Sequence, residues 1–73
     1  MPKVPLLKPK EVIRVFKKFG WVVARSSGSH IILTKEGNIS TLSIPNHNEI
    51  ARGTLRALID KSGLTIEDFI KKL

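Results

Sequence analysis

Residues 21–44 read WVVARSSGSHIILTKEGNISTLSI, and this stretch decides the fold. It contains three runs with the composition of strands, namely WVVARS (21–26), SHIILT (29–34) and ISTLSI (39–44). Ser27-Gly28 predicts a tight hairpin turn between the first two runs, and KEGN (35–38) predicts a second turn. Pro45 ends the third run because proline has no N–H to donate to a sheet. Three consecutive strands joined by short turns predict an antiparallel meander.

The segment before the strands has helical periodicity. Pro9 suits the first turn of a helix, and Gly20 is placed to end it in a left-handed conformation. Between them, apolar residues recur at a spacing that makes one stripe on a helix, with Lys10, Arg14, Lys17 and Lys18 elsewhere on its surface. The members of the predicted stripe are Val12, Ile13, Phe16 and Phe19.

Two more helices are predicted after the strands. Residues 54–62 (TLRALIDKS) repeat apolar side chains at helical spacing through Leu55, Leu58 and Ile59, with a start at Gly53 or Thr54 and a stop at Gly63. A short last helix begins at Thr65, where T-x-x-D resembles a capping box that uses Asp68. Its predicted apolar face comprises Ile66, Phe69, Ile70 and Leu73.

The predicted order is therefore α-β-β-β-α-α, an α+β domain with one three-stranded antiparallel sheet and helices on one face. The chain has 73 residues, enough for one small domain that spans 1–73. An α-β-β-β-α order is also the layout of double-stranded-RNA-binding domains, which read A-form geometry and phosphates. The strands lack the rows of aromatic residues by which RNA-recognition motifs stack bases, so binding would rest on charge and shape.

Charge is unevenly distributed along the chain. It has 13 Lys and Arg against 6 Asp and Glu, for a formal net charge of +7. Residues 1–35 hold eight basic side chains and a single acid, Glu11, whereas residues 36–73 hold five of each sign. This asymmetry favours a basic surface that attracts a polyanion. The alternative is an ordinary solvated surface with a high pI.

Several classes of protein are excluded by composition. The chain has no cysteine, which rules out disulfides, a thiolate nucleophile and a cysteine-based zinc site. The longest apolar run, Trp21 to Ala24, is far too short for a membrane span. MPKVPLLKPK (1–10) lacks the continuous hydrophobic segment of a secretory signal, and we assign no role to residues 1–7. We therefore expect a cytoplasmic protein that does not contact a membrane.

His30 is the first candidate for a catalytic residue. It opens the second strand beside a Ser/Gly turn, and side-chain alternation places it with Ile32 on one face and Leu33 on the other. If Leu33 meets the helices, His30 lies on the outer face. Arg25 and the hydroxyls of two serines, Ser26 and Ser29, are close to it in sequence. Spacing alone leaves a structural histidine as the commoner interpretation.

His47 in IPNHNE is the second histidine. Two histidines with Glu49 could form part of a metal site, but the H-x-x-x-H and E-x-x-H spacings are missing, so we expect no metal and no cofactor. His47 is interpreted either as a residue that fixes the turn after the third strand or as a secondary catalytic group. The chain also lacks G-x-S-x-G, P-loop and G-x-G-x-x-G motifs.

The runs FGWVVARSSGSHIILTKEG (19–37) and SIPNHNEIARGTLRALIDKSGLTIEDFIKKL (43–73) resemble the HicA toxins of prokaryotic toxin–antitoxin pairs. The likeness extends from about Lys8 to Leu73. Four short motifs carry it in order, and together they are specific although G-S-H alone is common. They are Gly20-Trp21, Gly28-Ser29-His30, Ile44-Pro45-Asn46-His47 and Gly53-Thr54-Leu55-Arg56.

The resemblance implies a double-stranded-RNA-binding-like fold and a metal-independent endoribonuclease that cleaves mRNA. It implies that His30, the histidine of G-S-H, is the catalytic residue, and that a HicB-type antitoxin inhibits the toxin. We expect this antitoxin to cover the catalytic face, because that is the simplest way to hold such an activity off. Residues predicted to bind RNA are Arg25, Ser26, Ser29, Lys35, Lys17 and Lys18. A non-catalytic RNA- or DNA-binding module, and a subunit that binds an acidic protein, remain as alternatives.

Overall fold

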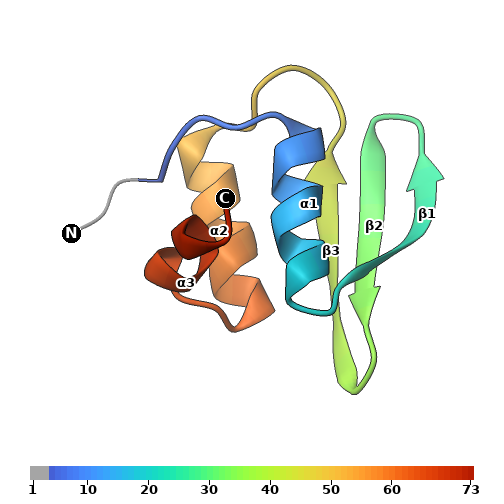
Figure 1. Ribbon diagram of the computed structural model, residues 1–73. Coiled ribbons are helices and arrows are strands. Elements are labelled where there is room, and N and C mark those ends of the chain that lie inside the picture. Colours follow the sequence, from blue (N-terminus) through green and yellow to red (C-terminus); the bar gives the residue numbers. More distant parts are fainter. Residues whose placement is uncertain (1–3) are drawn as a thin grey trace.

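The computed structural model describes residues 4–73, so the first three residues of the chain lie outside the described part. Its element order is the predicted α-β-β-β-α-α (Figure 1). The elements are α1 (Pro9–Lys18), β1 (Val22–Ser27), β2 (His30–Lys35), β3 (Asn38–Pro45), α2 (Arg52–Ser62) and α3 (Ile66–Lys71).

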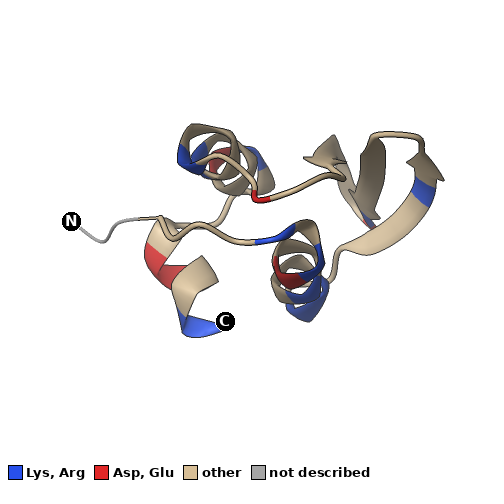
Figure 2. Cartoon of the chain, turned by 90° about the horizontal axis from the view of Figure 1, so that it is seen from above, with Lys and Arg blue, Asp and Glu red and all other residues tan. Residues whose placement is uncertain are grey.

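The three strands form one antiparallel sheet in the order β1-β2-β3, which confirms the predicted meander. Seen from above, the helices lie to one side of the sheet (Figure 2). This is the predicted α+β fold, and it resembles a double-stranded-RNA-binding domain. In the described part of the chain, none of the helices has the length and hydrophobicity needed to cross a membrane.

Helix α1 starts and ends close to the predicted positions, but its buried face is rotated. The backbone N–H of Lys8 donates to Glu11 Oε1 at 3.0 Å, Pro9 is the first helical residue, and Gly20 has a φ of +98°. The buried residues of α1 are Pro9, Val12, Val15 and Phe16. Ile13 and Phe19, which the sequence placed on the buried stripe, are only partly buried against the core.

The last two helices agree well with the sequence. Leu55, Leu58 and Ile59 are the buried apolar residues of α2, as predicted, although α2 starts at Arg52, slightly earlier than expected. Thr65 caps α3, because the Asp68 N–H donates to Thr65 Oγ1 at 3.0 Å and the Thr65 N–H donates to Asp68 Oδ2 at 3.3 Å. Satisfying these amides stabilises a helix that has only six residues.

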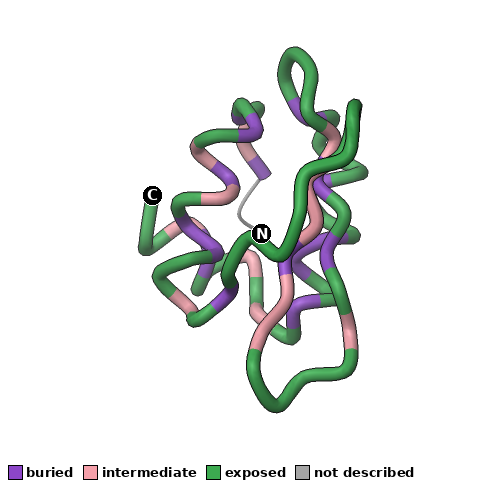
Figure 3. The backbone as a smooth tube through the Cα atoms, turned by 90° about the vertical axis from the view of Figure 1, so that its right-hand side faces the viewer, coloured by how far each residue is buried: buried purple, intermediate pink, exposed green. Residues whose placement is uncertain are grey.

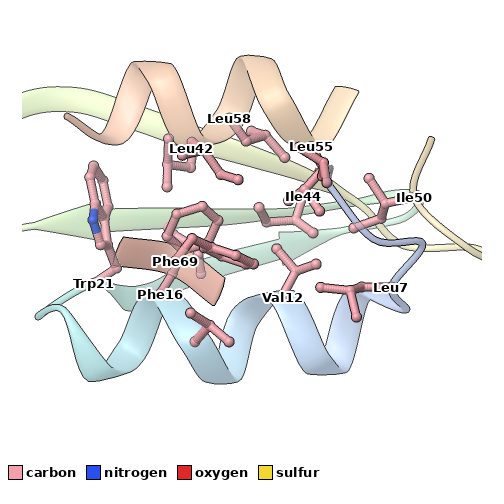
Figure 4. Packing of buried hydrophobic residues seen from close by; sticks show 14 residues of the cluster. Leu7, Val12, Phe16, Trp21, Leu42, Ile44, Ile50, Leu55, Leu58 and Phe69 are labelled. Carbon is pink, nitrogen blue, oxygen red and sulfur yellow. The ribbon is translucent and has the colours of Figure 1, made fainter. Parts of the chain in front are cut away.

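The core lies between the helices and the inner face of the sheet (Figure 4). Leu33, Leu42 and Ile44 from the strands are fully buried. Phe16 is near the centre: its ring centroid is 5.1 Å from that of Phe69 and 6.4 Å from that of Trp21, both in edge-on geometry. Trp21, which the sequence placed in the first strand, precedes β1 and is 1% exposed.

The N-terminal segment adds to this core, although the sequence assigned it no role. Val4 and Leu7 are buried. The Ile50 N–H donates to the Leu7 carbonyl at 2.8 Å, and Arg52 Nε donates to the Val4 carbonyl at 3.0 Å. The segment is therefore fastened to the start of α2.

Candidate active site

The first hairpin turn sets the position of His30. Ser27 and His30 form the last pair of the β1–β2 ladder, so the two turn residues are Gly28 and Ser29 rather than the predicted Ser27-Gly28. Gly28 has a φ of +54°, as the first central residue of a type II′ turn requires, whereas Ser29 has no positive φ. The turn is thus displaced by one residue, and His30 pairs with Ser27 instead of Arg25, a change of two residues in register that keeps each side chain on its predicted face.

The predicted faces of β2 are confirmed despite that shift. Leu33 is fully buried on the helix side, and His30, on the opposite face, is exposed. In the ladder, His30 lies between Ser27 of β1 and Pro45 of β3. Ile32, the next residue along on this outer face, is half-buried and lies between Arg25 and Ser43. The outer face therefore presents an imidazole with a guanidinium on the neighbouring strand.

The imidazole of His30 is oriented by the turn itself. Ser29 Oγ lies 3.2 Å from His30 Nδ1, within hydrogen-bonding distance. This contact occupies Nδ1 of the ring and leaves Nε2 available for another contact. If Nδ1–H donates to the hydroxyl, Nε2 is free to accept a proton; if the hydroxyl donates to Nδ1, Nε2 carries a proton that it can donate. The same pair therefore suits either half of an acid–base reaction.

His47 lies in the loop that follows β3, at the same end of the sheet. The Asn46 N–H donates to the Ser29 carbonyl at 2.7 Å, which fastens this loop to the first hairpin turn. His47 and Glu49 are exposed in the loop. The structure thus brings His47 to the end of the sheet where His30 lies. The pairing of β2 with β3 places them there, although the two histidines are far apart in the sequence. Among the described residues, no group of three His, Cys, Asp or Glu side chains is placed to hold a metal ion.

The predicted RNA-binding residues do not all gather at this end. Arg25 lies on the same face as His30, two pairs further along the ladder. Ser26 pairs with Ile31, which packs against the core, so its side chain is on the face opposite His30.

Lys35, one of the residues predicted to bind RNA, lies far from His30. Lys35 ends β2, five residues from His30 or roughly 17 Å along an extended strand. Its side chain instead lies over Gly20, with Lys35 Cε 3.3 Å from where a Cβ on that glycine would be. An extended strand thus separates His30 from Lys35, although the two residues are close in sequence.

Two further cations are at the end of α1. Lys17 and Lys18 are exposed in its last turn, and Lys18 Nζ donates to the Lys72 carbonyl at 2.9 Å. With Lys10 and Arg14, they make α1 the most basic element in Figure 2. This charge belongs to the helix layer, on the other side of the sheet from His30.

Residues 9–64 of the 73-residue chain match the model of one protein family, described as the HicA toxin of bacterial toxin–antitoxin systems. The chain belongs to the HicA toxin family. It is accordingly the toxin of a toxin–antitoxin system, and an antitoxin is its partner. A comparison with curated proteins gives no match.

All four motifs of the HicA resemblance lie within the matched region. Two of them adjoin in the fold: Gly28-Ser29-His30 forms the first turn, and Ile44-Pro45-Asn46-His47 is the end of β3 that pairs with it. The HicA match thus covers both segments that build the outer face around His30.

Proposed function

We propose that this HicA-family toxin is an endoribonuclease that cleaves mRNA without a metal ion, with His30 as its catalytic residue. The observation that carries the proposal is the placement of His30: exposed on the outer face, first in β2, and held through Nδ1 by Ser29. A histidine used only for packing has no need of this exposure. Cleavage of mRNA in the cytoplasm would stop translation and growth.

The chemistry uses the nucleophile that RNA carries. The ribose 2′-OH loses its proton to a base and attacks the adjacent phosphorus, while the bond from phosphorus to the 5′-oxygen breaks. The leaving 5′-oxygen takes up a proton, and the products are a 2′,3′-cyclic phosphate and a 5′-hydroxyl. A histidine side chain can accept or donate a proton near neutral pH, so His30 Nε2 is suited to one of these transfers.

The second proton-transfer group is less well defined than the first. His47 is the best-placed candidate, because its loop is hydrogen-bonded to the turn that carries His30. Lys35, at the far end of β2, is unsuited to the role. Arg25 is instead suited to hold the phosphate and to stabilise its charge in the transition state, since a guanidinium keeps its proton. With one well-supported histidine, we expect a slow enzyme.

The partner that controls this activity is an antitoxin of the HicB type, which we propose covers the face around His30. Exposure of His30 and Arg25 supports occlusion, because a protein laid on the outer face would hide both from RNA. Its contact surface is expected to be acidic or rich in hydrogen-bonding groups, since complementary charge speeds association with a basic chain.

The test compares purified variants on a long unstructured RNA with EDTA present. His30→Ala is expected to abolish cleavage while changing the free energy of unfolding by less than about 0.5 kcal/mol, as is usual at exposed sites. Ser43→Ala, also on the outer face, is the matched control and should cleave normally. A folded His30→Ala chain that still cleaves RNA would refute the catalytic assignment. RNA binding without cleavage by the unmodified chain would leave a binding module as the function.

A further inference from the structure

Within the described residues 4–73, strand β1 is an open edge of the sheet. It pairs with β2 on one side, whereas α1 and α2 pack against β3 at the other side of the sheet. All six residues of β1 are exposed, as Figure 3 shows for the strand nearest the viewer. A strand of this length presents about 20 Å of backbone, with unpaired N–H and C=O groups along its outer side.

The features that usually protect a sheet edge are weak in β1. Its sequence, VVARSS, contains neither proline nor lysine, and Arg25 is its single charge. A register shift between Val23 and Arg25 twists the strand at Ala24. Val22 and Val23 are nonetheless 56% and 43% exposed, which adds apolar surface beside the unpaired backbone. An exposed edge of this kind is a template for pairing with another chain.

We propose that β1 is the docking edge for the antitoxin, which adds an extended acidic segment to the sheet as a fourth strand. Backbone hydrogen bonds would supply affinity and the exposed valines an apolar contact, as in other cases of strand addition. The existence of the partner follows from membership of the HicA family. Its effect on RNA cleavage rests on the function proposed above for His30.

Charge favours the antitoxin, and not a second copy of this chain, as the protein that binds along β1. Another copy would bring a further +7 to the interface. Antiparallel pairing of two β1 strands would also bring the Arg25 of each copy close to the other near the centre of the edge, and like charges that face each other across strands are destabilising. An acidic segment of the antitoxin adds no positive charge and places no arginine opposite Arg25, with which it forms an ion pair.

The position of β1 explains how docking there would reach the catalytic face. Neighbouring strands are about 4.8 Å apart, so an added strand lies roughly 10 Å from β2. Ser27, the last residue of β1, pairs with His30. An antitoxin strand that runs along β1 therefore ends next to the catalytic turn, and the residues that follow it can fold over His30.

The first test measures the affinity of the toxin for its HicB-type antitoxin, which is the probe. Val22→Glu places a carboxylate on the edge, where it repels an acidic strand, and is expected to weaken binding at least tenfold by calorimetry. Ile39→Glu is the matched control, because Ile39 is fully exposed on β3, and it should bind within twofold of the unmodified chain. Unchanged affinity in Val22→Glu would overturn the proposal.

The second test follows the backbone itself by amide hydrogen exchange. The amides of β1 that point away from β2 should exchange quickly in the free toxin and slowly in the complex. If they stay fast in a saturated complex, strand addition is wrong, even where Val22→Glu weakens binding. A free toxin that dimerises, and that Val22→Glu makes monomeric, would instead assign the edge to a second copy. Neither test uses RNA cleavage, so a toxin without ribonuclease activity would refute the proposed function alone.

Discussion

The contact between Ser29 and His30 gives a prediction that separates two roles for the serine. Ser29→Ala removes the hydroxyl 3.2 Å from Nδ1 and leaves the turn backbone unchanged. If Ser29 orients the ring, His30 samples unproductive rotamers in the variant and kcat falls. If Ser29 only contacts RNA, as the sequence suggested, KM rises and kcat does not change.

The size of the effect follows from the exposure of the pair. A net hydrogen bond between neutral groups contributes about 0.5–1.5 kcal/mol, and each 1.36 kcal/mol in barrier height is tenfold in rate. Both side chains are exposed, so water replaces part of the lost contact. We therefore expect the lower part of the range, a fall in kcat of about two- to fivefold.

Initial rates at saturating and limiting RNA concentrations, with RNA in excess over enzyme, measure kcat and KM separately. Ser29→Thr retains the hydroxyl and should restore most of the rate, whereas Ser43→Ala removes a hydroxyl from the same face and should have no effect. A kcat equal to that of the unmodified chain in Ser29→Ala would refute the orienting role. Equal losses in the Ala and Thr variants would do the same, because the hydroxyl would then be irrelevant.

Two further predictions concern stability and RNA binding. Phe69→Ala empties a fully buried site beside Phe16 and should lower the free energy of unfolding in urea by about 3–5 kcal/mol. This is a large part of the roughly 4–11 kcal/mol expected for a chain of this length. A loss below about 1 kcal/mol would contradict the packing of α3. Arg25→Gln should weaken RNA binding more than Lys35→Gln and flatten the plot of log affinity against log salt by about 0.7 for the lost phosphate contact. Equal effects of these two variants would show that nearness to His30 does not decide which cation binds RNA.

The elements were predictable because their signals are local. The period of Leu55, Leu58 and Ile59 predicts a buried helix face wherever the helix packs, and a threonine followed three residues later by an aspartate caps a helix through its own backbone. The faces of β2 were predictable for the same reason, since side chains alternate along any strand.

The predictions that were wrong concern residues whose positions depend on contacts with distant parts of the sequence. Nothing in the periodicity of α1 distinguishes Val15 from Ile13 until the position of the sheet is known. Val4 and Leu7 lie in a proline-containing segment without a period, and they are buried because distant residues, Ile50 and Arg52, bond to that segment. The first turn lies one residue later than predicted, because its first central position requires glycine, and the prediction had placed Ser27 there.

The two strands that build the candidate site differ in how firmly they are held. β2 is anchored from behind by Leu33, which is fully buried, and its outer face presents His30. β1 supplies Arg25, but all of its residues are exposed and β2 holds it on one side only. Regions with few buried contacts open at lower free energy than the core, so the guanidinium sits on the less stable part of the site.

This difference connects catalysis with control. A phosphate bound between Arg25 and His30 would join the loosely held strand to the anchored one, whereas an added antitoxin strand would hold β1 from its open side. Competition between the two ligands would come from the outer face, where antitoxin residues that follow the added strand would cover Arg25 and His30. Inhibition in this arrangement needs no change in the position of His30: the antitoxin has only to occupy the edge and the face that RNA requires.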